Sequence, residues 1–193
     1  MNFLAHLFLS GDDEALLVGN FIGDFVTNRD LEAYPSGVRD GVMLHRRIDR
    51  YTDNHPLVLQ GVRRLYAGHG KYAPVIVDVY YDHLLAVNFE AFHDAPLPEF
   101  AAYVYEVLRR REEWLPPVLQ RRLPLMIADD WLTSYASLEG LDYAFQRMKH
   151  RASKPWYLDG AVDSLRAQYD QYEEEFRQFF PDVQDFVSRD REG

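Results

Sequence analysis

The chain has 193 residues, which suits one domain, and its 47% hydrophobic and 15% aromatic content excludes a disordered protein. It has no cysteine, which excludes disulfides, thiolate metal sites and a cysteine nucleophile. The net charge of -10 disfavours a nucleic-acid partner, and no run of about 18 apolar residues predicts a membrane span. We expect one cytoplasmic domain, residues 1–193, with neither nucleic acid nor a membrane as partner.

Apolar residues recur at three- and four-residue spacing, which predicts an all-α protein, a compact single-domain helical bundle. Capping residues or prolines mark most of the starts, and glycine or proline most of the ends. We expect Pro116 and Pro117 to stop one helix and Pro181 to end or kink the last one. In chain order, the predicted helices run from Asp12 or Asp13 to about Thr27, from Pro35 and Ser36 through Asp53, from Pro56 to near Gly68 and Gly70, from Pro74 through Phe92, and over 99–114, 129–138, 139–151 and 157–180.

Imidazole and carboxylate groups are concentrated in the first half of the chain. His6 lies in an apolar segment, as either a ligand or a hydrogen-bonded core histidine. Asp24 has apolar neighbours, so its carboxylate is expected to face inward or to line a cleft. On a helix, His45, Asp49 and Asp53 project from nearly one face. The two aspartates can act as ligands together with the imidazole, or they can form ion pairs with neighbouring arginines.

A later stretch carries Asp78 and Asp82 one helical turn apart, with His83 about 100° round the helix. Aspartate is a poor helix former and is costly to bury, so a functional role is favoured. Helices that bring His and Asp together can bind a divalent cation such as Mn²⁺, Mg²⁺, Fe²⁺ or Zn²⁺ through nitrogen and oxygen. The spacing therefore predicts a metal site, and the absence of thiolates favours a catalytic one.

Four segments of the first half stand out: MNFLAHL at 1–7, GNFIGDFV at 19–26, GVMLHRRIDRYTDNHP at 41–56 and APVIVDVYYDHLLA at 73–86. In this order they resemble the signature blocks of the acyl carrier protein phosphodiesterase family. The second half resembles that family only in being helical, rich in aromatic residues and acidic towards its end.

The resemblance implies an HD-domain-like phosphohydrolase that removes 4′-phosphopantetheine from holo-acyl carrier protein. It also implies a divalent metal, with Mn²⁺ as the first expectation and Mg²⁺ or Fe²⁺ as alternatives. The chain departs from the usual HD pattern, because Asp82-His83 reverses the order and the pair His93-Asp94 lies in a predicted loop. The ligands therefore follow from the matched blocks and not from the HD motif.

The expected roles fall into three groups. The metal ligands are His6, Asp24, His45, Asp78 and Asp82, with Asp49 undecided. The catalytic residues are Asp24, Arg46 as a clamp on the phosphate, and His83 as a ligand or a proton donor to the leaving oxygen. The residues expected to bind the acidic carrier protein are Arg46, Arg47, Arg50, Arg63 and Arg64, with Arg109, Arg110 and Arg111 as further candidates. Tyr80 and Tyr81 either line a groove for the pantetheine arm or pack in the core.

Two other functions stay open. An HD-type phosphohydrolase of a nucleotide or another small phosphate ester would use the same ligands. A helical module that holds a metal and binds carrier protein would hydrolyse nothing. The sequence has no nucleophile-elbow serine, which disfavours a serine hydrolase, and no Walker pattern or dinucleotide fingerprint, which excludes kinases and dehydrogenases.

Overall fold

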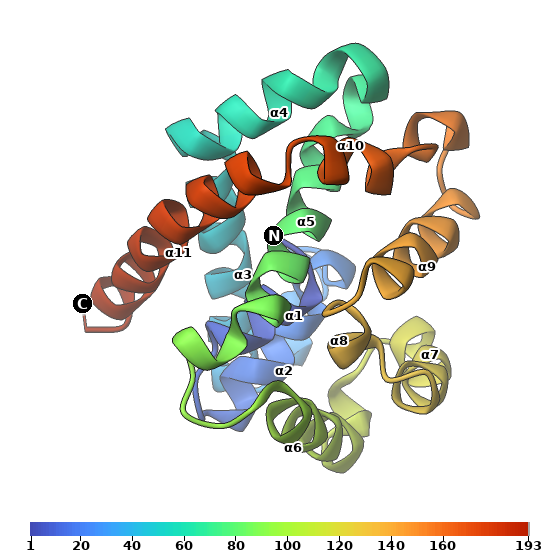
Figure 1. Cartoon of the computed structure of the whole chain (residues 1–193). Coiled ribbons are helices and arrows are strands. Elements are labelled where there is room, and N and C mark those ends of the chain that lie inside the picture. Colours follow the sequence, from blue (N-terminus) through green and yellow to red (C-terminus); the bar gives the residue numbers. More distant parts are fainter. Residues whose placement is uncertain (193) are drawn as a thin grey trace.

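Helices follow one another through residues 1–192, the part of the chain that the computed structural model describes, and no strand occurs among these residues. The predicted domain, 1–193, extends one residue further. The prediction of an all-α fold is confirmed, whereas the HD-like topology stays a prediction. The helices are α1 (Phe3–Phe8), α2 (Glu14–Ile22), α3 (Ser36–Asn54), α4 (Pro56–His69), α5 (Ala73–Val87), α6 (Leu97–Arg110), α7 (Pro117–Ala128), α8 (Trp131–Ser134), α9 (Leu138–Lys149), α10 (Ala161–Ala167) and α11 (Tyr169–Glu192) (Figure 1).

Local signals account for most of the helix starts. The Asp13 carboxylate accepts a hydrogen bond from the Leu16 N–H at 2.9 Å and caps α2. The Ser137 hydroxyl caps α9 in the same way by accepting from the Gly140 N–H at 3.0 Å. Prolines occupy the first turn of α4, α5, α6 and α7, where their missing N–H leaves no hydrogen bond unmade.

The sequence pattern predicts neither α1 nor α7. Helix α1 has only six residues, and its first N–H groups are bound by a carboxylate from α5, a contact that local sequence does not reveal. Helix α7 is missed because Pro116 and Pro117 resemble a stop signal. Pro117 is in fact the first residue of the next helix, so the pair ends one element and begins another.

The C-terminal prediction, one helix over 157–180 that Pro181 ends or kinks, has the wrong bounds. The chain forms α10 and then breaks at Gln168 before α11 begins. Helix α11 continues through Pro181 to Glu192 instead of ending there. Phe180 and Val183, on either side of the proline, are fully buried. Their packing offsets the loss of the backbone hydrogen bond that proline cannot make.

The core is formed by α5 together with the helices around it, and α11 lies alongside α3 and α4 (Figure 1). Tyr80 and Tyr81 are fully buried, and the Tyr81 ring stacks on Phe179 at a centroid distance of 5.1 Å. The two tyrosines therefore pack in the core and do not line a groove. No helix of residues 1–192 has both the length and the apolar character needed to cross a bilayer.

Helices α2 and α3 cross at very short range because Gly19 and Gly41 face each other. A Cβ on Gly19 would lie 2.1 Å from the Val38 carbonyl oxygen, and a Cβ on Gly41 would lie 2.3 Å from the Leu16 carbonyl oxygen. Only glycine permits this approach. The crossing places the side chains of α3 next to the end of α2, where the candidate site lies.

Candidate metal centre and cleft

Three side chains from α1 and α3 meet at one point. The Nε2 atom of His6 lies 3.0 Å from Oδ1 of Asp49, and the Nε2 atom of His45 lies 3.2 Å from Oδ2 of the same carboxylate. The two imidazole rings stack with their centroids 3.9 Å apart. One donor atom from each of the three residues lies within 4.8 Å of the others, so a single cation can contact all three.

Asn20 at the end of α2 fixes both rings. Its side-chain oxygen accepts from Nδ1 of His6 at 2.8 Å, and its backbone oxygen accepts from Nδ1 of His45 at 2.8 Å. The amide nitrogen of Asn20 is held in turn by the His6 carbonyl and the Ser10 hydroxyl, which opposes a flip of the amide. Each Nδ1 therefore carries the proton, and each Nε2 points towards Asp49. A hydrogen bond from the other ring nitrogen to a protein oxygen is typical of histidines that bind metals.

The His6 ring faces two hydrogen-bond acceptors, the side chains of Asn20 and Asp49. Burial lowers its pKa to about 4, so the ring is neutral at pH 7 and carries one proton, which Asn20 uses. The Nε2 lone pair then faces a carboxylate oxygen of Asp49 at 3.0 Å. Two lone pairs at this distance repel each other unless a positive charge lies between them. The pair is thus suited to share a cation.

His45 is in the opposite state. Burial acts to lower its pKa, but hydrogen bonds to Asp24 and Asp49 outweigh this and raise the pKa to about 9. The Nε2 atom lies 3.3 Å from Oδ1 of Asp24, and this contact lowers the pKa of Asp24. His45 is therefore protonated at neutral pH while no metal is bound. Gly23 permits this position, since a Cβ there would lie 2.2 Å from Cγ of His45.

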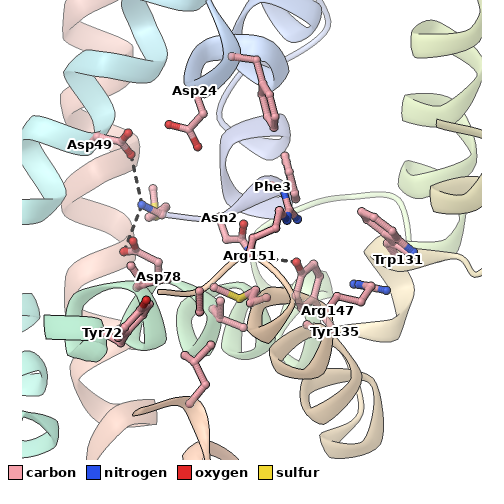
Figure 2. A pocket seen from close by; sticks show the side chains of 18 of the residues that line it. Asn2, Phe3, Asp24, Asp49, Tyr72, Asp78, Trp131, Tyr135, Arg147 and Arg151 are labelled. Carbon is pink, nitrogen blue, oxygen red and sulfur yellow. Dashed lines mark hydrogen bonds and ion pairs between the residues drawn. The ribbon is translucent and has the colours of Figure 1, made fainter. Parts of the chain in front are cut away.

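Asp78 joins the group from α5. The amino group of Met1 lies 3.2 Å from Oδ1 of Asp78 and 3.3 Å from Oδ1 of Asp49, and so links the two carboxylates. Burial opposes the charge on this amino group, but the two aspartates raise its pKa to about 10. Burial also raises the pKa of Asp78. Figure 2 shows Asp24, Asp49 and Asp78 gathered on one side of the opening.

These carboxylates line a cleft of about 500 Å³. Phe3, Tyr72, Trp131 and Tyr135 contribute aromatic walls. Arg147 lies beside Trp131 and Tyr135, and Arg151 lies between them and the carboxylates (Figure 2). A cleft with an acidic end, apolar walls and a basic side has the form of a binding site for an elongated anionic ligand.

Two predicted site residues, Asp82 and His83, lie outside this group. Asp82 is fully buried, and its two oxygens accept from the N–H groups of Leu4 at 2.8 Å and Ala5 at 3.1 Å. It therefore caps α1, and burial raises its pKa to about 7. His83 hydrogen-bonds the Tyr135 carbonyl through Nδ1 and the Tyr169 hydroxyl through Nε2, and it does not line the cleft. Both positions are structural in character.

Substitution of Asp82 by Ala is expected to destabilise the fold by about 2–4 kcal/mol, because two buried N–H groups lose their acceptor. Urea unfolding followed by circular dichroism measures this change. The Asp82→Asn variant, which retains one acceptor oxygen, should lose less. A variant with unchanged stability and no activity would instead make Asp82 a ligand.

The arginines predicted to bind substrate are mostly held by protein groups. Arg46 donates to the Val26 carbonyl at 2.8 Å and to the Asn28 side chain at 2.6 Å, and so fixes the segment after Asp24. Four of the others form ion pairs: Arg47 with Asp190, Arg64 with Glu175, and Arg110 and Arg111 with Glu14. Arg50, Arg63 and Arg109 are exposed.

Asp49 is more central to the candidate site than its sequence context indicates, and three further residues there carry no clear sequence signal. Asp49 stands four residues after His45, a spacing that was visible, but pairing with a nearby arginine was an equally simple explanation. Asn20 had no signal of its own, because its role depends on contacts with two other helices. Arg147 and Arg151 come from the second half, where the sequence offers no motif.

An all-α protein with imidazoles and carboxylates gathered at one end of an open cleft has the form of an enzyme. The family model of acyl carrier protein phosphodiesterase matches residues 1–183. The chain belongs to the acyl carrier protein phosphodiesterase family, a family of enzymes.

Relatives bearing the name acyl carrier protein phosphodiesterase cover nearly the whole chain. A protein of Escherichia coli O45:K1 is 34% identical, with 98% of both chains covered. One from Enterobacter sp. (strain 638) is 32% identical over 94% of both chains, and one from Photorhabdus laumondii is 30% identical over 94% of this chain and 92% of its own. No solved structure matches this chain.

Proposed function

We propose that this protein hydrolyses the phosphodiester of holo-acyl carrier protein, releases 4′-phosphopantetheine and leaves the apo protein. We further propose that His6, His45 and Asp49 hold a divalent cation, Mn²⁺ as the first expectation, with Asp24 and Asp78 beside it. Family membership supports the substrate, and the cluster at the acidic end of the cleft supports the metal.

The orientation of the two imidazoles carries the metal proposal. Asn20 accepts from both Nδ1 atoms, so both Nε2 atoms are directed at one carboxylate. An all-nitrogen-and-oxygen donor set of this kind suits Mn²⁺, Mg²⁺ or Fe²⁺. A plain core histidine would need only one such partner. Here two stacked rings direct their second nitrogen at the same acid, His6 with a free lone pair and His45 with a proton that a bound metal would displace.

The residues around the cluster have distinct tasks in hydrolysis. When bound, a divalent cation neutralises phosphoryl oxygens and acidifies water. Asp24 is open to the cleft beside His45 and is placed to accept the proton of the attacking water. Asp78 lines the cleft on the other side of Asp49, and is better placed than His83 to return a proton to the leaving serine oxygen. The aromatic walls hold the pantetheine arm.

The carrier protein must dock against net repulsion, because both partners are acidic. The predicted docking arginines divide into two sets. Arg47 and Arg64 are bound to acids of α11, which leaves little charge for a partner. Arg50 and Arg63 are exposed on α3 and α4, and they are the members of the predicted patch that we propose to meet the carrier protein.

Affinity for Mn²⁺ is expected to rise about tenfold per pH unit from pH 6 to about 8. The pKa of His45 is about 9, so below that value a metal must displace one proton from His45. His6, with a pKa of about 4, is already neutral and adds nothing to the slope. Calorimetric titration of Mn²⁺ in buffers of increasing pH measures this dependence. An affinity that does not change over this interval would contradict the role of His45. The Asp24→Ala variant lacks one contact that raises the pKa of His45, so its rise in affinity should level off at a lower pH.

The reaction itself is tested by mass spectrometry of the substrate. Holo-carrier protein incubated with the enzyme and Mn²⁺ should lose the mass of its phosphopantetheine unit, and a chelator should prevent the loss. An unchanged mass with a folded, metal-loaded enzyme would refute the proposal. Turnover of nucleotides or small phosphate esters in place of carrier protein would favour the broader phosphohydrolase function.

A further inference from the structure

Two arginines line the cleft on the side away from the carboxylates. Arg147 lies near the end of α9, and Arg151 follows one helical turn later. Figure 2 shows Arg147 beside the aromatic wall and Arg151 between it and the acidic group of Asp24, Asp49 and Asp78. The cleft therefore has a basic side facing its acidic end.

Arg147 is held in a fixed position with a donor left over. Its guanidinium carbon lies over the ring of Trp131 at 3.9 Å from the centroid and over that of Tyr143 at 4.5 Å, so the group makes two cation–π contacts. Its Nη1 atom is buried and has no hydrogen-bond partner, and the indole Nε1 of Trp131 is in the same condition. Buried donors without acceptors are costly, so both groups would be stabilised by an acceptor that reached them.

Arg151 adds a second positive charge close by. Burial lowers its pKa, and the neighbouring charges of Arg122 and Arg147 lower it further. Among residues 1–191, no acidic side chain forms an ion pair with any of these three arginines, in contrast to Arg47 and Arg64. Like charges are thus held together at the cleft without a protein anion to neutralise them, which is an arrangement suited to an external anion.

We propose that Arg147 and Arg151 bind the phosphodiester anion of the substrate on the side of the cleft opposite the carboxylates, an inference that rests on the proposed function. A guanidinium plane matches two phosphate oxygens and adds orientation to charge. The phosphate then lies between the arginines and the candidate cation site. Arg46, the clamp expected from the sequence, has both terminal nitrogens engaged by Val26 and Asn28.

A binding experiment without catalysis tests the anion site directly. Inorganic phosphate is titrated into chelator-treated protein while the indole N–H resonance of Trp131 is followed by NMR. The wild type should show a saturable shift, and Arg151→Ala and Arg147→Lys should bind at least about tenfold more weakly. Arg147→Lys keeps the charge but loses the fork, which limits the risk of unfolding. The matched control is Arg121→Ala, which removes an exposed arginine outside the cleft and should bind like the wild type.

Kinetics with holo-carrier protein provide the second readout. Arg151→Ala should lose roughly ten- to a hundredfold in kcat/KM, mainly through a higher KM, whereas Arg121→Ala should be unchanged. A higher KM with unaltered phosphate binding would mean that the arginines contact the protein part of the substrate, and the proposal would be wrong.

The two proposals fail separately. Phosphate binding that depends on Arg147 and Arg151, without any hydrolysis of carrier protein, would support the anion site and refute the proposed substrate. Phosphate binding that is unaffected in both variants would reject the anion site even if hydrolysis proceeds.

Discussion

Replacement of Asp49 by Ala is expected to lower kcat/KM for holo-acyl carrier protein by at least about a hundredfold, more than follows from loss of a residue that only hydrogen-bonds a metal ligand. The Asp49 carboxylate is the group that both His6 and His45 face, at 3.0 and 3.2 Å. Without it the two Nε2 atoms have no common acid, and a cation loses one of its three closest donors. The measurement is steady-state hydrolysis followed by the mass of the carrier protein.

Asp53→Ala is the matched control for this substitution. Asp53 lies one turn further along α3 and lines the same cleft, but it contacts neither imidazole. Burial raises its pKa, so its removal should not harm the fold. We expect its activity to stay within a few fold of the wild type. Equal losses in the two variants would mean that general acidity of the cleft, and not a cluster centred on Asp49, supports the reaction.

The Gly19→Ala substitution is expected to destabilise the protein by about 3 kcal/mol, near the upper end for overpacking. The new Cβ would lie 2.1 Å from the Val38 carbonyl oxygen and 2.8 Å from Cα of Gly41. Both are backbone atoms, so no side-chain rotation can relieve the contact and the two helices must move apart. Because this crossing also brings His45 to Asn20, affinity for Mn²⁺ should fall as well. Urea unfolding measures the first effect and calorimetry the second.

Gly68→Ala is the control for the same chemical change. Gly68 lies in α4, and a Cβ there would meet no atom within 4 Å. Alanine favours a helix over glycine by up to about 1 kcal/mol, so this variant should be as stable as the wild type or slightly more so. Gly19→Ala with unchanged stability would show that α2 and α3 do not depend on close contact at this point.

The sequence predicts the helices whose ends are set by local signals. It does not predict the helix ends that depend on contacts with distant residues. Caps such as Asp13 and first-turn prolines mark the starts of α2, α4 and α5. Helix α1 is different, because its N–H groups depend on Asp82, which is about seventy-eight positions away in the chain. Helix α11 continues past Pro181 because buried residues on both sides hold it.

The candidate site shows the same division. The spacing of His45 and Asp49 on one helix face was readable, and Asp24 lines the cleft as its apolar neighbours indicated. Asp82, also an aspartate in a helix, was expected to bind a metal by the same reasoning. Its carboxylate instead accepts hydrogen bonds from backbone N–H groups. Periodicity reports which side chains share a face, but it does not report what that face meets. For this reason the arginines of the cleft were not recognised as a group.

The central claim, that two imidazoles and a carboxylate of α1 and α3 bind one divalent cation, is tested most directly by electron paramagnetic resonance of Mn²⁺. Titration of metal-free protein should show the signal of free Mn²⁺ suppressed by binding in the wild type. In folded His6→Ala and His45→Ala variants that suppression should be largely lost. Undiminished binding of Mn²⁺ by both variants would contradict the account.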